Sequence, residues 1–208
     1  MKKIILSLSL LLAATFSFAQ SKDDVLSGSE TITWLGIDYS QVKFIGSATQ
    51  WQDAGDITNL QLRDKYFPAW NNLIENEPTR YKVAEAINRA EVNYATNVTA
   101  KVNNGLKGNF FSDDFNDFSH LSEGDIKKLV SNYNFQGKKG IGFMFFAEAM
   151  SKGKEAASYW ITLVNMDTKK MIFTHQVTAK AGGFGFRNYW AGSIVKAIKE
   201  TKSNIKKW

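Results

Sequence analysis

The sequence predicts an α/β protein of the α+β type, in which helices pack on a mixed, largely antiparallel sheet with a C-terminal three-strand meander. Three consecutive runs rich in apolar and aromatic residues lie between residues 140 and 180, separated by short polar turns. Four other stretches carry apolar residues at helical spacing, at residues 57–74, 79–89, 122–134 and 188–206. Strands and helices are therefore expected to be interspersed up to the meander, which a last helix follows.

The meander is predicted from the alternation of side chains along each run. Residues 140–150 are apolar at both odd and even positions, which is typical of a central strand covered on both faces. Residues 157–166 form the second strand and residues 171–180 the third. The third strand has one polar face, which we expect to contact water, formed by Thr174, Gln176 and Thr178.

Two further strands are expected before the meander. Residues 31–46 predict one long strand, or two short strands bent near Gly36 or Asp38, because glycine weakens a strand and permits a bend. Residues 91–102 alternate between apolar and polar positions and predict another strand.

The predicted helices carry recognisable start and break signals. Pro68 lacks a backbone N–H group, so it should break or kink the helix over residues 57–74. Ser122 and Asp125 have the spacing of a capping box at the start of the helix over residues 122–134.

The N-terminal residues have the three regions of a secretory signal peptide. Two lysines precede the apolar run at residues 4–18, and a small residue, Ala19, ends it. Residues 1–19 are therefore predicted to be removed, which leaves Gln20 as the new N-terminus. We expect a periplasmic or secreted protein.

The rest of the chain is predicted to form one domain. Residues 20–30 are polar and are interpreted as a flexible leader, and residues 31–208 as a single α/β domain. After the signal peptide no segment is long and apolar enough for a transmembrane helix, so no membrane anchor is expected.

Composition argues against several classes of protein. The chain has no cysteine, which excludes disulfides and a lipid-modified N-terminal cysteine. Removal of Lys2 and Lys3 with the signal peptide leaves 24 basic and 20 acidic residues, a net charge of +4. This excess is small and dispersed, so nucleic acid is not an expected partner.

The two histidines are weak candidates for chemistry. His120 follows Asp113, Asp114 and Asp117, but no spacing matches a known metal motif, so neither a metal site nor a cofactor is predicted. His175 shares a strand face with apolar residues, which favours a core or edge histidine over a general base. No serine-nucleophile motif occurs, and no catalytic residue is assigned.

The glycine cluster before the last helix is the sharpest local feature. Gly183 and Gly185 precede that helix, and backbone N–H groups there could hold a phosphate or carboxylate with Arg187 as a charged partner. Asn188 occupies the third position of the glycine fingerprint and no strand follows, which argues against a dinucleotide site. A structural hinge is the other interpretation, and the sequence favours it.

A second candidate surface is the polar face of the third meander strand. Beside Trp160, its threonines and glutamine would make a mixed polar and aromatic surface for a peptide, a glycan or a lipid. His175, on the other face of the same strand, is a further candidate binding residue. An ordinary solvated sheet face is the alternative.

The turn Asp167-Thr168-Lys169-Lys170, between two strands that feed a C-terminal helix, resembles part of a known module. It is similar to the α/β module of bacterial envelope-assembly proteins, including the N-terminal domain of TolB, the curli secretion lipoprotein and the activator lipoproteins of peptidoglycan synthases. Lys169 stands where those families often have glycine. For the C-terminal half, the resemblance implies a non-catalytic interaction module in the periplasm and transfers no site residues.

The sequence thus leads to two expectations about function. The first is an exported, non-catalytic protein that binds another envelope component through an exposed sheet face or the glycine corner. The alternative is a small-ligand-binding protein or a hydrolase that uses His175 or the acidic loop beside His120.

Overall fold

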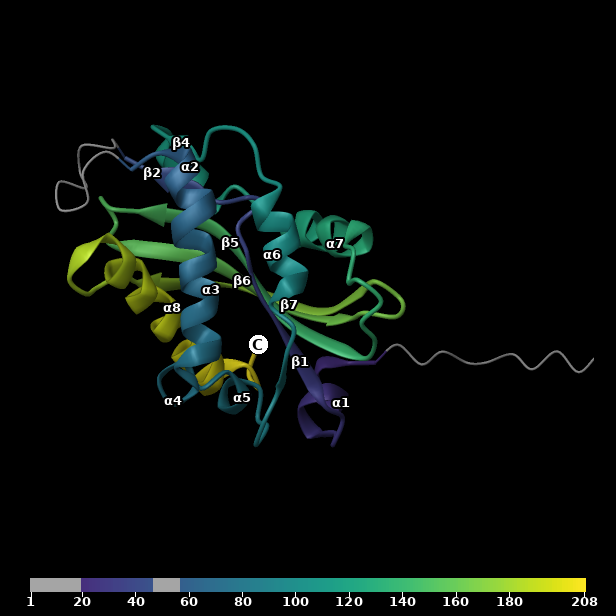
Figure 1. The fold of residues 1–208 in the computed structure, drawn as a ribbon. Coiled ribbons are helices and arrows are strands. Elements are labelled where there is room, and N and C mark those ends of the chain that lie inside the picture. Colours follow the sequence, from purple (N-terminus) through teal and green to yellow (C-terminus); the bar gives the residue numbers. More distant parts are fainter. Residues whose placement is uncertain (1–19, 47–56) are drawn as a thin grey trace, which may run out of the picture.

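The computed structural model describes residues 20–46 and 57–208, which form helices packed on a seven-stranded sheet (Figure 1). The strands are β1 (Ile32–Asp38), β2 (Lys43–Ile45), β3 (Asn93–Tyr94), β4 (Phe111–Ser112), β5 (Ile141–Ser151), β6 (Ala156–Asn165) and β7 (Lys170–Lys180). The helices are α1 (Lys22–Ser27), α2 (Asn59–Gln61), α3 (Phe67–Asn76), α4 (Pro78–Tyr81), α5 (Val83–Ala86), α6 (Asn97–Asn104), α7 (Glu123–Asn132) and α8 (Gly185–Asn204), with a π-helical turn at Leu62–Tyr66 and a 3-10 turn at Phe115–Ser119. The α/β class is confirmed.

The expectation of a largely antiparallel sheet is wrong. Every pairing along the main path, β3-β1-β5-β2-β4, is parallel. Antiparallel pairing is confined to β5, β6 and β7, which form the meander at the other edge of β5. The physical reason is connectivity: helices separate β2, β3, β4 and β5 in the chain, and a helical crossover returns the chain parallel to the previous strand.

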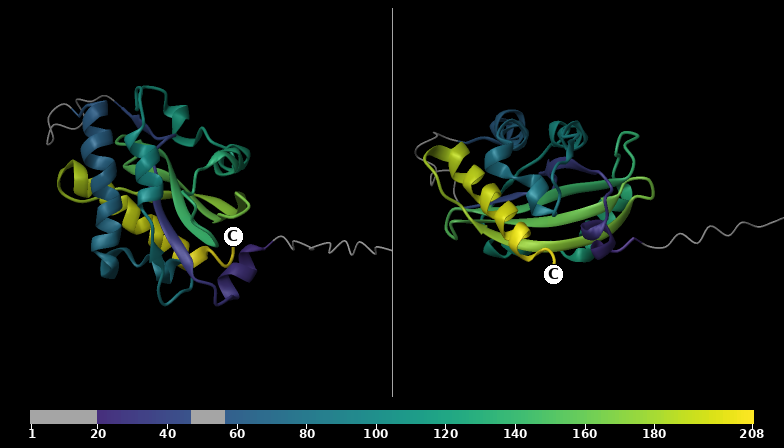
Figure 2. Two further views of the ribbon diagram at one scale, coloured as in Figure 1. Left: turned by 45° about the vertical axis from the view of Figure 1, so that its right-hand side comes forward. Right: turned by 90° about the horizontal axis from the view of Figure 1, so that it is seen from below.

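Strand β5 is the centre of this arrangement. Its residues are buried along the whole strand, as the apolar character of both faces predicted. On one edge it pairs with β1 near its start and with β2 near its end, so that β1 and β2 together act as one interrupted strand. The long strands are curved, and helices cover them on both sides (Figure 2).

Two apolar cores lie on opposite faces of the sheet. The larger core is covered by α3 and α8, and Trp34, Trp70 and Trp190 are fully buried in it. The smaller core lies beneath α6 and α7, where Val98 and Ile126 are fully buried. Both faces of β5 are therefore removed from water.

Several predicted elements differ from the structure. Half of the strand expected over residues 91–102 is helix α6, and β3 is the extended part. Val98 of α6 is buried in the smaller core, and α6 packs against β1, so the apolar positions of this stretch serve a helix. The leader expected to be flexible, residues 20–30, contains α1, whose Val25 and Leu26 are buried in the larger core.

Pro68 is accommodated without a break. The helical run continues from Asn59 to Asn76, and a π-helical turn precedes the proline. Phe67 N–H donates to the carbonyl of Leu62, five residues back, which widens the helix where Pro68 cannot donate.

Strand β1 contains a bulge whose polar groups are satisfied by side chains. Its register with β5 shifts between Trp34 and Gly36. Gly36 has φ +98°, and a Cβ atom there would lie 2.4 Å from the hydroxyl of Thr99 and 2.9 Å from Oδ1 of Asn71. A residue with a side chain at this position would therefore have a strained backbone and would clash with Thr99 and Asn71.

The two helices beside β1 supply the missing hydrogen bonds at this bulge. From α3, Asn71 accepts from Ile37 N at 2.7 Å and donates to Ile37 O at 3.0 Å. From α6, Asn103 donates to Ile37 O at 2.9 Å and accepts from Tyr39 N at 2.9 Å. Buried backbone groups need such partners, so the bulge ties α3 and α6 to β1, where they lie side by side (Figure 1).

Replacing Asn71 with alanine should lower the free energy of unfolding by about 1–3 kcal/mol, because Ile37 N loses its acceptor inside the protein. Urea denaturation followed by tryptophan fluorescence measures this change. Asn72→Ala is the matched control, because Asn72 is exposed on the next position of the same helix. Equal stability of the two variants would contradict the role assigned to Asn71.

Candidate functional site: a cleft between α6 and α7

Helix α7 is held over the sheet by a buried carboxyl group at each of its ends. Before the helix, Leu121 N donates to Oε1 of Glu148 at 2.6 Å. After it, the hydroxyl of Tyr133 donates to Oδ2 of Asp38 at 2.7 Å. The two acids are fully or almost fully buried, and they come from β5 and β1. The helix is thus fixed by polar contacts at its ends and by apolar packing between them.

Local sequence explains where α7 begins. The predicted capping box is confirmed: Ser122 accepts from Asp125 N at 3.3 Å, and Asp125 accepts from Ser122 N at 2.9 Å. The hydrogen bonds from Ser122 lower the pKa of Asp125, which stays ionised near neutral pH. Between the ends, Ile126 and Val130 face the smaller core.

Asp38 lies at the carboxyl end of a parallel strand, which is a common position for ligand sites in α/β proteins. Its Oδ1 accepts from Ser40 N at 2.7 Å, in addition to the Tyr133 bond to Oδ2. Burial raises the pKa of Asp38, and the hydrogen bonds from Ser40 and Tyr133 offset part of that effect. Burial, with the nearby Asp38 charge, also raises the pKa of Tyr133, which stays a neutral donor.

No basic side chain among residues 20–46 and 57–208 lies within ion-pair distance of Asp38. A buried carboxylate without a cationic partner is costly, which is the physical reason for its raised pKa. The surroundings of Asp38 therefore disfavour its ionised form relative to water.

A cleft of about 600 Å³ opens above Asp38, between α7, the end of α6 and the β1–β2 connection. Half-buried Val102, Leu121 and Leu129 form its apolar wall. Exposed Asp125 and Lys128 lie on its wall beside them, and Ser40 and Gln41 line it from the β1–β2 connection. An apolar cleft with a few convergent polar groups and a titratable group of shifted pKa has the character of a small-molecule site.

Glu148 belongs to a separate, closed network. It is the bulged residue of β5, where the register with β6 shifts between Ala147 and Ala149. Its Oε2 accepts from Ser158 at 2.6 Å and from Gln176 at 2.6 Å. All of its partners are fixed protein groups, so Glu148 serves to hold the segment before α7 onto the sheet.

The glycine corner is a close packing of backbone segments. Gly182 N donates to Tyr189 O at 3.0 Å, and a Cβ atom at Gly192 would lie 2.0 Å from Gly182 O. Gly183 has φ +136°, and Gly185 is the first residue of α8. The positive φ of Gly183, and the 2.7 Å that would separate a Cβ atom there from Asn188 O, account for glycine at this position.

Arg187 and Asn188 are exposed at this corner and lie in a shallow cavity of about 430 Å³ with Lys65 and the exposed Phe184. The carbonyl of Arg187 accepts a hydrogen bond from the indole of Trp70 at 2.9 Å, which anchors the first turn of α8. The structure therefore brings Gly183, Gly185, Arg187 and Asn188 together, away from the cleft over Asp38.

Trp160 and His175 lie on opposite faces of the sheet. Trp160 is 8% exposed and packs in the smaller core. His175 stacks on Trp208, with ring centroids 4.2 Å apart, on the face of the larger core. Burial, and to a lesser extent the charge of Lys22, lowers the pKa of His175. These two candidate binding residues therefore do not belong to one surface.

His120 lies on the α7 side, where its Nδ1 contacts the carbonyl of Asp117 at 2.7 Å. Within the described residues, no group of three or more histidine, aspartate or glutamate side chains is placed to hold a metal ion. His120 and His175 belong to opposite faces, so they do not form one site.

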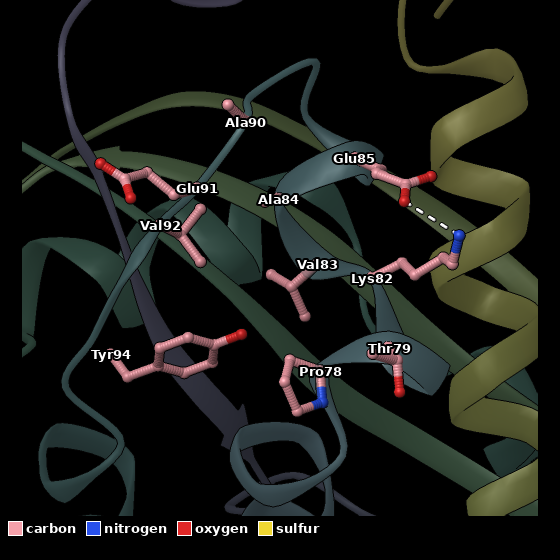
Figure 3. Close-up of a pocket in the computed structure, with 10 residues that line it drawn as sticks. All are labelled: Pro78, Thr79, Lys82, Val83, Ala84, Glu85, Ala90, Glu91, Val92 and Tyr94. Carbon is pink, nitrogen blue, oxygen red and sulfur yellow. Dashed lines mark ion pairs between the residues drawn. The ribbon is translucent and has the colours of Figure 1, made fainter.

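A second cavity, of about 530 Å³, lies between α4, α5 and the segment that leads into β3 (Figure 3). Tyr94 points into it toward Pro78 and Val83, and an ion pair of 3.0 Å joins Lys82 to Glu85. Of the ten residues drawn, Val83 alone is buried, and its side chain is apolar. Lys82 and Glu85 pair with each other, Glu91 is exposed to water, and no buried titratable group of the described residues lines the cavity, which makes the Asp38 cleft the better candidate.

Asp38 was not predicted from the sequence as a site residue. A single acid at the end of an otherwise buried strand was the available signal, because aspartate is seldom buried without a reason. Its partner Tyr133 is distant in the sequence, so the pair could not be foreseen from spacing.

No family model, curated protein or solved structure matches this chain. The resemblance of its C-terminal half to envelope-assembly modules therefore stays a prediction. Among the described helices, none has the length and apolar character needed to cross a membrane.

Asp38 should make stability depend on pH. Its folded-state pKa is raised, so the stability that it contributes is complete below the unfolded pKa of about 4 and is lost as pH rises through the folded pKa. Asp38→Asn removes this loss, so the variant should gain stability relative to the wild type as pH rises from about 4 to about 7.

Urea denaturation over that pH range, with the exposed Asp113→Asn as control, measures the difference. A difference in unfolding free energy that stays constant with pH would show that the Asp38 carboxyl is not perturbed.

Proposed function

We propose that this protein is an exported, non-catalytic binding protein that holds a small amine-bearing molecule in the cleft between α6 and α7. The observation that carries this proposal is the buried Asp38 carboxyl, which lines the cleft and has no cationic partner among the described residues. A ligand ammonium or guanidinium group would supply that partner.

Electrostatics favour a cation over an anion at this position. An ammonium group beside Asp38 would stabilise the ionised carboxylate and form a charge-assisted hydrogen bond. An anionic ligand would instead be opposed by Asp38 and by the ionised Asp125 at the cleft wall, although Lys128 offsets part of the Asp125 charge. Binding of a cation should therefore lower the pKa of Asp38 and release a proton wherever that carboxyl was protonated.

The cleft wall suits an apolar body attached to the amine. Val102, Leu121 and Leu129 offer aliphatic surface beside Asp38. Each apolar square ångström removed from water contributes about 25 cal/mol, so these contacts would supply affinity while Asp38 supplies selectivity.

Both oxygens of Asp38 already accept hydrogen bonds from fixed donors, Ser40 N and the Tyr133 hydroxyl. These two hydrogen bonds fix the position of the Asp38 carboxylate, which supports a role in binding a ligand in preference to a role in proton transfer.

Export is proposed from the signal-peptide pattern of residues 1–19, which lie outside the described residues, and it would bring the protein to the periplasm or the exterior. The described part begins at Gln20, and Ser21 caps α1, accepting from Asp24 N at 3.2 Å. Cleavage after Ala19 would thus leave α1 with its cap complete.

Matched pairs of amines and alcohols test the ligand class directly. We expect 2-phenylethylamine and hexylamine to shift the amide resonances of Val102 and Leu129 in two-dimensional NMR spectra. 2-Phenylethanol and hexanol should bind about tenfold more weakly, because they lack the charge-assisted bond to Asp38. Asp38→Asn should remove the preference for amines, whereas Asp113→Asn should keep it.

Affinity for the amines should rise with pH through the pKa of Asp38, since only the ionised carboxylate pairs with the cation. Equal binding of alcohols and amines, or amine-induced shifts away from the cleft, would refute the proposal.

The export proposal predicts that the protein recovered from outside the cytoplasm of the producing cell begins at Gln20. N-terminal sequencing or intact mass measurement of that material checks the cleavage site. Ala19→Asp should block processing, because a small residue is needed at the cleavage position. A recovered protein that still begins at Met1 would contradict the proposal.

A further inference from the structure

The edge of β7 that faces away from β6 is open. Within residues 20–46 and 57–208, β7 pairs with β6 alone along the length of both strands. The other outer strands on the main path, β3 and β4, contain only two residues each, whereas β7 contains eleven. About half of the N–H and C=O groups of β7 therefore point away from the sheet over about 36 Å.

The exposure of β7 comes from this edge. Helix α7 lies beside one of its faces and α8 beside the other, yet every residue from Met171 to Gln176 remains half-buried. Strand β6 lies in the same sheet but has a neighbouring strand on each edge, and it is buried along almost its whole length. The outer edge of β7 thus has no strand partner within the described residues, while its side chains are held in place.

Side-chain contacts keep β7 rigid. Gln176 donates to Glu148 at 2.6 Å and to Ser119 at 2.8 Å, and Thr174 bonds with Thr162 at 2.9 Å. On the other face, Phe173 and His175 pack with Trp208. A rigid edge with free hydrogen-bonding groups is preorganised to receive another strand.

The charges along this edge are basic. Exposed Lys170 and Lys180 mark the two ends of the strand. Gly140 is held at the β6–β7 turn by hydrogen bonds with Met166 N and the carboxylate of Asp167. The segment before Gly140 therefore lies at this turn, and its exposed Lys138 and Lys139 add positive charge to that of Lys169 and Lys170.

These lysines disfavour a second copy of the chain as the added strand. In an antiparallel pair that overlaps all eleven residues, Lys170 of one copy would lie opposite Lys180 of the other at both ends. Like charges directly opposite each other destabilise strand pairing, and lysines commonly protect sheet edges from self-association.

We propose that β7 binds an extended peptide segment with acidic residues at its ends, which adds to the sheet as an eighth strand. Main-chain hydrogen bonds to β7 supply the affinity, and the lysines at both ends select acidic partners. This site is independent of the Asp38 cleft, which lies on the other side of α7 from the β7 edge.

The test uses a short fluorescent peptide of alternating valine and threonine with glutamates at both ends. We expect it to bind the full chain in anisotropy titrations and to protect alternate β7 amides from hydrogen exchange. The same peptide with lysines in place of glutamates, or with a methylated backbone, should bind at least about tenfold more weakly.

Lys170→Glu with Lys180→Glu should reduce binding of the acidic peptide by about tenfold or more. Lys101→Glu with Lys107→Glu makes the same change in net charge on exposed residues elsewhere and should leave binding unchanged. Both pairs are surface changes, and circular dichroism confirms that each variant is folded.

Two results would overturn the proposal. One is absence of peptide binding, or equal binding of the methylated peptide, which would show that the backbone edge is not used. The other is dimerisation of the chain in sedimentation experiments with protection of β7, which would assign the edge to a second copy.

Discussion

Much of this structure depends on one constraint: the buried backbone of β1 must be satisfied beyond its register shift with β5, where β3 no longer pairs with it. Asn71 and Asn103 satisfy Ile37 and Tyr39 at that point. Their side chains reach β1 from two different helices, so the same hydrogen bonds that satisfy the strand also position α3 and α6. The free-energy cost of one unpaired buried peptide group is a large fraction of the net stability of a domain.

The same departure creates the site. After Asp38 the chain leaves β5 and rejoins it at β2, and Asp38, the last residue of β1, accepts a hydrogen bond from Tyr133 at the end of α7. On the neighbouring strand, the bulge at Glu148 turns a second carboxyl toward the start of that helix. Two local irregularities in adjacent strands thus give α7 its two attachment points, and the cleft lies along the helix between them and α6.

Sequence patterns predicted the parts of the fold that depend on local chemistry. The three long strands, the capping box at Ser122 and the last helix follow from alternation, hydrogen-bonding side chains and helical spacing. The parallel pairing could not be predicted, because β3 and β4 contain two residues each and carry no periodic signal. The partnership of Asp38 with Tyr133 depends on tertiary contact between residues far apart in the chain, which spacing does not encode.

The apolar wall of the cleft is formed by residues that contribute little to either core. Val102, Leu121 and Leu129 are half-buried and lie at the margin of the smaller core, whereas Asp38 is anchored by the strand and by Tyr133. Selection can therefore alter the shape of this wall while the carboxylate and the fold stay constant. Descendants of this chain could acquire different ligand preferences through a few aliphatic exchanges, with no new architecture required.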